Sequence, residues 1–210
     1  GGGGFLKNGK PFVHNVQAAE KVYYDFTFEA RNKGGHSSRP IRDNAIYHLA
    51  DALARLERYD FPVKLNDVTK AYFERLGQVE TGQTAADMRA VAKNPKDTAA
   101  VRRLSAQPVY NSMLRTTCVA TMLEGGHADN ALPQSAKGTV NCRIFPGIQP
   151  KDVQAELQAM AGPKVEVTPD PLYIGEPTPA SPVRPDVLKA VTDAVQHFHG
   201  KDMHVFPVMS

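Results

Sequence analysis

The stretch VYYDFTFEARNKGGHSSRP, residues 22–40, decides the fold. In residues 22–29 every second side chain is apolar, which is the pattern of a half-buried β-strand. The apolar face consists of Val22, Tyr24, Phe26 and Phe28. Gly34-Gly35 then breaks the strand, and Asp43 is expected to cap a helix over residues 44–57, where apolar side chains recur at helical spacing.

The rest of the chain continues this alternation of strands and helices. Strands are predicted at 115–123, 136–145 and 164–167. Pro150 is expected to open a helix that carries Val153, Leu157 and Met160, and another helix is predicted at 183–199. This order predicts an α+β, two-layer sandwich, with an antiparallel sheet of about four strands and helices on one face. Residues 66–105 interrupt it with two or three helices, for which Asp67, Thr84 and Asp97 are the expected N-caps.

Composition narrows the class of protein. The chain has 210 residues, of which 41% are hydrophobic and 22% charged, as is ordinary for a globular protein. The net charge of +3 is spread along the chain and argues against nucleic acid binding, which needs a concentrated basic surface. No apolar run reaches 18 residues, so no membrane-spanning helix is predicted.

The two cysteines, Cys118 and Cys142, are too few for a disulfide framework. Each lies in a β-like run, which favours two buried thiols over a bridge. The cysteines therefore do not indicate a cellular compartment, and cytoplasmic, periplasmic and secreted locations all remain open.

The chain has seven histidines, each a potential metal ligand. His127 and Asp129 are two residues apart, but they lie in a glycine-rich stretch without a second His or carboxylate pair, so no metal site is predicted there. His197 and His199 suit the end of a helix, where cations are favourable. His48 and His14 are expected to be solvated, in a helix and a loop respectively.

Three polar positions are candidates for binding chemistry. His36 follows two glycines at the end of a strand, Asn130 precedes Ala131-Leu132-Pro133, and Arg143 precedes a Pro-Gly turn. Taken singly, each is typical of a turn or surface residue. Together, an imidazole, an amide and a guanidinium suit a carbonyl oxygen and a carboxylate, but they include no nucleophile.

Three motifs give the chain a family resemblance. NKGGHSSRP at 32–40, GGHADNALP at 125–133 and NCRIFPG at 141–147 resemble, in order and spacing, the co-catalytic zinc peptidases. That family includes carnosinase-like dipeptidases, aminoacylase, glutamate carboxypeptidases and succinyl-diaminopimelate desuccinylase. Residues 20–175 resemble its lid and dimerisation domain, with 66–105 as a helical insertion. Residues 1–19 resemble the connection from the catalytic domain, and 176–210 a linker and the return into it.

The resemblance implies an enzyme that hydrolyses an amide bond in a small peptide or acyl-amino acid, using two zinc ions. It implies that His36 reaches across a homodimer to the partner's site, where it contacts the oxyanion and substrate. Asn130 and Arg143 correspond to substrate-binding residues. The family's metal ligands and general base have no counterpart in these 210 residues, so a fragment of this length is expected to bind no metal and to be inactive alone.

The alternative is a free-standing α+β module that binds a ligand or another protein, because fold alone does not establish function. Two features of the ends count against it. The chain opens on Gly1-Gly2-Gly3-Gly4, which reads as an engineered linker or a cut, and it closes on the strand-like residues 205–210. Both ends are therefore expected to continue into a larger protein.

Overall fold

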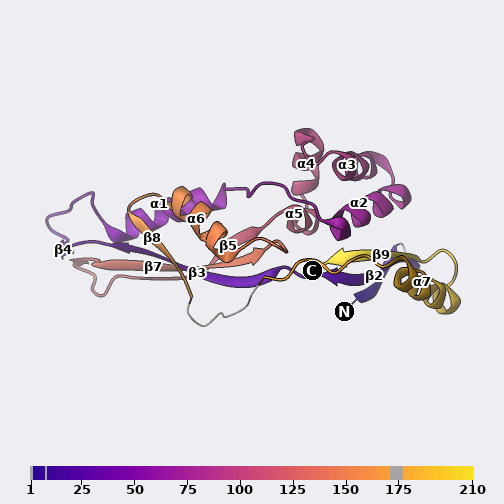
Figure 1. Cartoon of the computed structure of the whole chain (residues 1–210). Coiled ribbons are helices and arrows are strands. Elements are labelled where there is room, and N and C mark those ends of the chain that lie inside the picture. The colour runs from indigo at the N-terminus through magenta and orange to yellow at the C-terminus, as the bar shows by residue number, and fades with distance from the viewer. Residues whose placement is uncertain (1, 8, 171–176) are drawn as a thin grey trace. The chain divides into compact units, whose positions relative to one another are not determined.

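The computed structural model describes residues 2–7, 9–170 and 177–210. The chain folds into two compact units, each assembled from separate stretches of sequence (Figure 1). One unit comprises residues 22–61 and 116–177, and the other comprises 1–21, 62–115 and 178–210. The helices predicted as an insertion thus belong with the ends of the chain rather than with the flanking strands. Part of the linker expected after residue 170, at 171–176, lies outside the described residues.

The first unit is the predicted α+β sandwich. Its four-stranded antiparallel sheet has the order β5-β7-β3-β8, and helices α1 and α6 lie on one face (Figure 1). The elements are β3 Val22–Arg31, α1 Ala45–Glu57, β5 Thr117–Gly125, β7 Ser135–Ile144, α6 Pro150–Ala161 and β8 Val165–Pro169. Their order along the chain, β-α-β-β-α-β, is that of ferredoxin-like domains.

The central ladder between β3 and β7 runs over ten residue pairs, from Val22 opposite Ile144 to Arg31 opposite Ser135. Because side chains alternate across a strand, one face of this ladder is apolar and is covered by the helices. The largest buried side chains of this core are Phe26 and Phe28 of β3, Val140 and Ile144 of β7, and Val153 and Leu157 of α6. On the other face of β3, Tyr23 is exposed and Asp25, Thr27 and Glu29 are partly exposed, which confirms the alternation predicted for residues 22–29.

The N-caps differ from prediction in detail. Asn44, not Asp43, caps α1 by accepting a hydrogen bond from the Ile46 N–H. Asn66, not Asp67, caps α2 in a capping box with Thr69, whereas Asp97 caps α4 as predicted. Helix α3 begins at Gly82, so Thr84 lies inside it. In the first two cases an amide next to the expected carboxylate occupies the position from which a side-chain oxygen reaches the free N–H groups.

The cysteine prediction was wrong. Cys118 and Cys142 form a disulfide, with their Cα atoms 4.1 Å apart. They are separated by 24 residues in sequence, but the antiparallel pairing of β5 with β7 places them directly opposite each other. Strand pairing, which the sequence pattern does not specify, therefore decided the outcome.

The second unit combines a small sheet with five helices. The sheet order is β1-β2-β9, formed by Gly2–Lys7, Lys10–Ala19 and His204–Met209, and β9 runs parallel to β2. His14 therefore lies in a strand and not in a loop. The helices are α2 Asp67–Val79, α3 Gly82–Lys93, α4 Thr98–Ser105, α5 Pro108–Leu114 and α7 Pro185–His199.

Helix α2 packs against β9, where the rings of Tyr72 and Phe206 meet edge to face at 6.3 Å. A bidentate ion pair joins α3 to α4, because Arg103 donates to both oxygens of the buried Asp87 at 2.7 and 2.8 Å. This hydrogen bond holds the pKa of Asp87 below its usual range. No helix in the described parts of the chain combines the length and apolarity needed to cross a bilayer.

Candidate functional site

His36 lies on a loop that joins β3 to α1. Gly35 and His36 form the short strand β4, which pairs with β6, Ala131–Leu132. Gly34 has φ +75°, and an added Cβ would approach the side chain of Gln134 to 2.9 Å. Glycine is therefore required here both by the backbone conformation and by the available space.

The hydrogen bonds of His36 define its tautomer. The Ser38 backbone N–H lies 3.2 Å from Nδ1, and the Ser38 hydroxyl lies 2.9 Å from the same atom. A backbone N–H can only donate, so Nδ1 must accept and the proton of the neutral ring resides on Nε2. The exposed imidazole thus has an N–H donor on the side away from its own loop.

Asn130 is next to this loop. Its carbonyl accepts a hydrogen bond from the Ser37 N–H at 2.9 Å, and the Ala131 that follows it pairs with His36. The Asn130 side chain is exposed. The structure therefore brings together two of the three predicted residues, an imidazole donor and an amide.

Arg143 lies elsewhere, near the end of β7 on the open face of the sheet. Its guanidinium lies over the ring of Tyr23, 4.8 Å from the centroid. The Tyr23 hydroxyl donates to Asp25 at 2.7 Å, and this bond raises the pKa of Tyr23. Asn141 donates to the other oxygen of Asp25 at 2.6 Å. The four side chains form a polar cluster around an exposed cation.

The two groups are at opposite ends of the β3–β7 ladder. Arg143 pairs with Tyr23 at one end, and Arg31 pairs with Ser135 at the other, eight residues along β7. Eight residues of strand span about 26 Å, and β4 lies beyond that far end (Figure 1). A single small substrate cannot contact His36 and Arg143 of the same sandwich.

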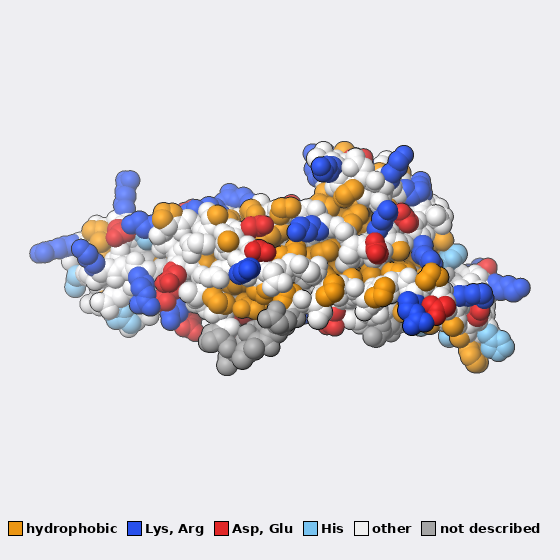
Figure 2. All heavy atoms as spheres, viewed as in Figure 1, with side chains coloured by type: hydrophobic (Ala, Val, Ile, Leu, Met, Phe, Trp, Pro, Cys, Tyr) orange, Lys and Arg blue, Asp and Glu red, His pale blue; other side chains and the backbone are white. Residues whose placement is uncertain are grey.

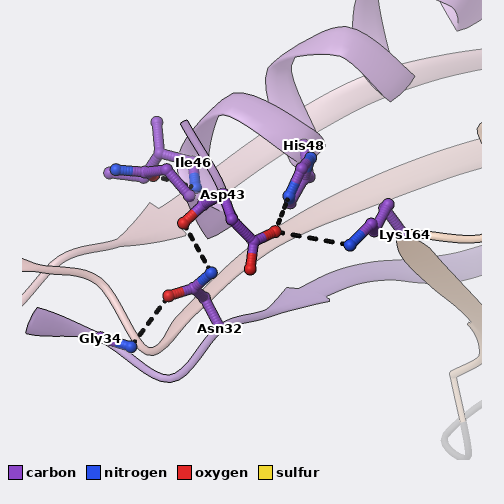
Figure 3. Close-up of polar contacts among 7 residues, drawn as sticks. Asn32, Gly34, Asp43, Ile46, His48 and Lys164 are labelled. Carbon is purple, nitrogen blue, oxygen red and sulfur yellow. Dashed lines mark hydrogen bonds and ion pairs between the residues drawn. The ribbon is translucent and has the colours of Figure 1, made fainter. Parts of the chain in front are cut away.

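Basic and imidazole side chains gather around the end that carries β4 (Figure 2). Lys33, Arg39 and Arg42 belong to this loop. At the base of the loop, His48 Nε2 lies 2.7 Å from Asp43 Oδ1 (Figure 3). His48 was expected to be solvated, and its partnership with Asp43 corrects that expectation.

Metal binding is not supported by the residues that the structure describes. None of them form a group of three His, Cys, Asp or Glu side chains able to hold an ion. His127 and Asp129 are exposed in the loop before β6.

Sequence reasoning missed the residues that hold the candidate groups. Asn32, Asp43 and His48 lie at the base of the His36 loop, and Tyr23 and Asp25 surround Arg143. A usable signal existed for Asn32, since an Asn two residues before a glycine is typical of a turn closed by the side chain. No comparable local signal marks Tyr23, because Arg143, which lies over its ring, is distant in sequence.

The fold is therefore an α+β sandwich that carries exposed polar groups at both ends of its central ladder. The sequence profile of the peptidase dimerisation domain matches residues 19–168, and the chain belongs to that family. It is therefore the kind of domain through which these peptidases associate.

Several relatives are similar in sequence. A probable carboxypeptidase S-like 2 of Dictyostelium discoideum is 30% identical over 143 residues, covering 67% of this chain and 27% of the relative. The mouse N-fatty-acyl-amino acid synthase/hydrolase PM20D1 is 27% identical over 182 residues, covering 85% of this chain and 35% of the relative. The chain thus spans between about a quarter and a third of the length of these relatives.

Solved structures agree on the fold. The M20 family metallo-carboxypeptidase Sso-CP2 of Sulfolobus solfataricus matches with a TM-score of 0.52 and 17% identity, covering 95% of this chain and 53% of that one. AtUAH in complex with glyoxylate matches with a TM-score of 0.51 and 12% identity, covering 93% of this chain and 36% of that one. At such identities the likeness concerns the fold alone.

Proposed function

We propose that this chain is the lid and dimerisation part of a zinc-dependent hydrolase that cleaves an amide bond next to a free carboxylate. The carrying observation is the pair of exposed groups at the two ends of the sandwich. One end offers a neutral N–H donor in His36, and the other offers a supported guanidinium in Arg143. These are the groups that recognise an oxyanion and a carboxylate.

His36 and Asn130 suit the reacting carbonyl. Attack on an amide carbonyl moves negative charge onto its oxygen, and a donor already aimed at that position stabilises the transition state more than the substrate. The Nε2–H of His36 is free of the contacts that Ser38 makes with Nδ1, and the Asn130 amide lies on the adjoining strand end. Both would contact the substrate at its scissile bond.

Arg143 suits the terminal carboxylate. A guanidinium can donate two parallel hydrogen bonds to a carboxylate, and the Tyr23 ring under it restricts its orientation. The names of the relatives, probable carboxypeptidase S-like 2 and N-fatty-acyl-amino acid synthase/hydrolase, are consistent with this chemistry. In both cases the amide joins an acyl group to an amino acid with a free carboxylate.

Self-association is proposed through the β5 edge and α1. Strand β5 is at the edge of its sheet, and Val119, Met122 and Leu123 are 60–67% exposed. A groove beside it is lined by apolar side chains of α1 and β5. These residues are Ile46, Leu49, Ala50, Leu53 and Leu123. An unpaired edge with an apolar border favours pairing with a second copy in a homodimer.

The dimer resolves the separation of the candidate groups. Since His36 and Arg143 of one sandwich are too far apart for one small substrate, each site would combine His36 and Asn130 of one subunit with Arg143 of the other. The zinc ions are proposed to bind to another part of the enzyme, because the described residues form no metal site. A fragment limited to these residues is accordingly expected to be inactive.

The test uses the full-length enzyme with an N-acyl-amino acid and a dipeptide as substrates. Replacing His36→Ala should lower kcat about 100-fold to 1000-fold, as expected for loss of an oxyanion donor, with zinc content unchanged by elemental analysis. His127→Ala removes an exposed imidazole from the neighbouring loop and should change neither quantity. A near-native kcat for His36→Ala, or an enzyme that purifies without zinc and works without it, would refute the proposal.

A further inference from the structure

Asn32 closes the loop that carries His36. Its side-chain oxygen accepts the Gly34 N–H at 2.9 Å, and its side-chain nitrogen donates to the Asp43 carbonyl at 2.7 Å (Figure 3). The side-chain amide of Asn32 therefore holds together the two ends of the loop formed by residues 33–42. The first bond also supports the left-handed turn at Gly34, from which the backbone enters β4.

Asp43, the far end of the loop, is itself fastened. Its carboxylate accepts from His48 Nε2 at 2.7 Å and lies 3.4 Å from Lys164 Nζ (Figure 3). His48 belongs to α1, and Lys164 directly precedes β8. The loop is thus connected through Asp43 to one helix and one strand of the sandwich, both of which have buried faces.

Between Asn32 and Asp43, the second half of the loop has few other restraints. Its first half pairs with β6 and with the Asn130 carbonyl, but residues 37–43 are all exposed. A loop that is largely solvent-exposed samples many conformations unless its ends are fixed. The Asn32 side chain fixes both ends at once.

We infer that Asn32 is a positioning residue, which holds the loop so that the Nε2–H of His36 points to the carbonyl oxygen of the substrate in the partner's site. Asp43 is the anchor on which Asn32 acts. This inference rests on the proposed role of His36. It assigns to Asn32 no contact with the substrate, only control over where the imidazole lies.

The variant Asn32→Ala removes both hydrogen bonds in the full-length enzyme. Because a displacement of about 1 Å can cost as much as 100-fold in rate, we expect kcat to fall about 10-fold to 100-fold, and KM to change by less than about twofold. Asn32→Asp keeps the acceptor for the Gly34 N–H but loses the donor to Asp43, and its kcat should lie between those of Asn32→Ala and the wild type. This graded recovery separates positioning from a general loss of folding.

The matched control is Gln154→Ala. Gln154 also uses its amide to donate to a backbone carbonyl, that of Val167 at 2.8 Å, but on α6 rather than on the loop. Hydrogen exchange of residues 33–42 should accelerate in Asn32→Ala and not in Gln154→Ala. The double variant Asn32→Ala/His36→Ala should be no slower than His36→Ala alone, because the two residues act through one imidazole.

Two results would overturn the inference. One is loop exchange that is unchanged in Asn32→Ala, and the other is a rate loss in the double variant that equals the product of the two single losses. If His36→Ala itself retains near-native kcat, the role proposed for His36 fails, and with it the catalytic part of this inference. The exchange measurement in Asn32→Ala then still reports whether Asn32 fastens the loop.

Discussion

The two ends of the β3–β7 ladder present their polar groups in different ways. At the β4 end, His36 belongs to an irregular loop whose position depends on Gly34, on pairing with β6 and on the amide of Asn32. At the other end, Arg143 is part of a regular strand and lies against Tyr23, its direct cross-strand neighbour. The first group is oriented by backbone turns, and the second by the pleat of the sheet.

This difference matches the chemistry proposed for each group. An oxyanion donor must be accurately placed, and a loop allows the backbone to be shaped around one ring. A carboxylate clamp gains most from a rigid support, which the sheet supplies. Because the two ends of the ladder are about 26 Å apart, the proposed site requires a dimer.

The largest expected effect comes from placing the substitutions at His36 and Arg143 in different subunits of one dimer. In a heterodimer of one His36→Ala subunit and one Arg143→Ala subunit, one composite site has both defects and the other has neither. Doubly tagged and purified, this heterodimer should regain about half of the wild-type activity per dimer, although both parent homodimers are impaired.

The matched heterodimer places both substitutions in one subunit and pairs it with a wild-type subunit. Each composite site then has one defect, so little activity should remain. If the groups instead served the site of their own subunit, the two heterodimers would exchange their activities. That exchange would contradict the composite site.

A smaller effect is expected at the strand end. Arg143→Lys loses the bidentate geometry and should weaken transition-state binding, as reported by kcat/KM, by about 1.5–3 kcal/mol. Most of this loss should appear as a higher KM. Tyr23→Leu removes the ring under the guanidinium and should cost about 0.5–1 kcal/mol. Tyr23→Phe keeps the ring and should be close to wild type. Steady-state kinetics with a carboxylate-bearing substrate and its amide analogue would measure each change.

The amide analogue provides the control, because it offers no carboxylate. The variants at Arg143 and Tyr23 should be indistinguishable from wild type on this substrate. An equal loss on both substrates would mean that these residues support the sheet rather than the substrate.

The smallest effect concerns the anchor of the loop. The hydrogen bond from His48, assisted by Lys164, holds the pKa of Asp43 below its ordinary value of 3.8. Because the pKa of Asp43 is lower in the folded than in the unfolded chain, its ionised carboxylate stabilises the folded state above pH 3.8. As the pH falls through the lowered pKa, that contribution is lost. The free energy of unfolding of wild type should therefore exceed that of Asp43→Asn near neutral pH, and the difference should shrink below pH 3.8. A pH-independent difference in denaturant titrations would exclude this ionisation as the cause.

Local patterns were sufficient for much of the fold. The alternation in residues 22–29 and 136–145 predicted the two central strands, and the helical spacing after residue 44 predicted α1. These patterns are reliable because a half-buried strand or helix must separate its apolar and polar faces. The same patterns did not predict β2, because its partner β9 lies nearly 200 residues away in sequence.

The sequence by itself determined that His36, Asn130 and Arg143 are exposed polar groups in breaks or at the ends of strands, because glycines, prolines and alternation are local properties. Only the tertiary structure decided how they are arranged. Strand register joined Cys118 to Cys142, brought Asn130 to His36, and put Arg143 at the opposite end of the ladder. The physical reason is that register and long-range pairing depend on packing between segments distant in sequence, which no local pattern of residues encodes.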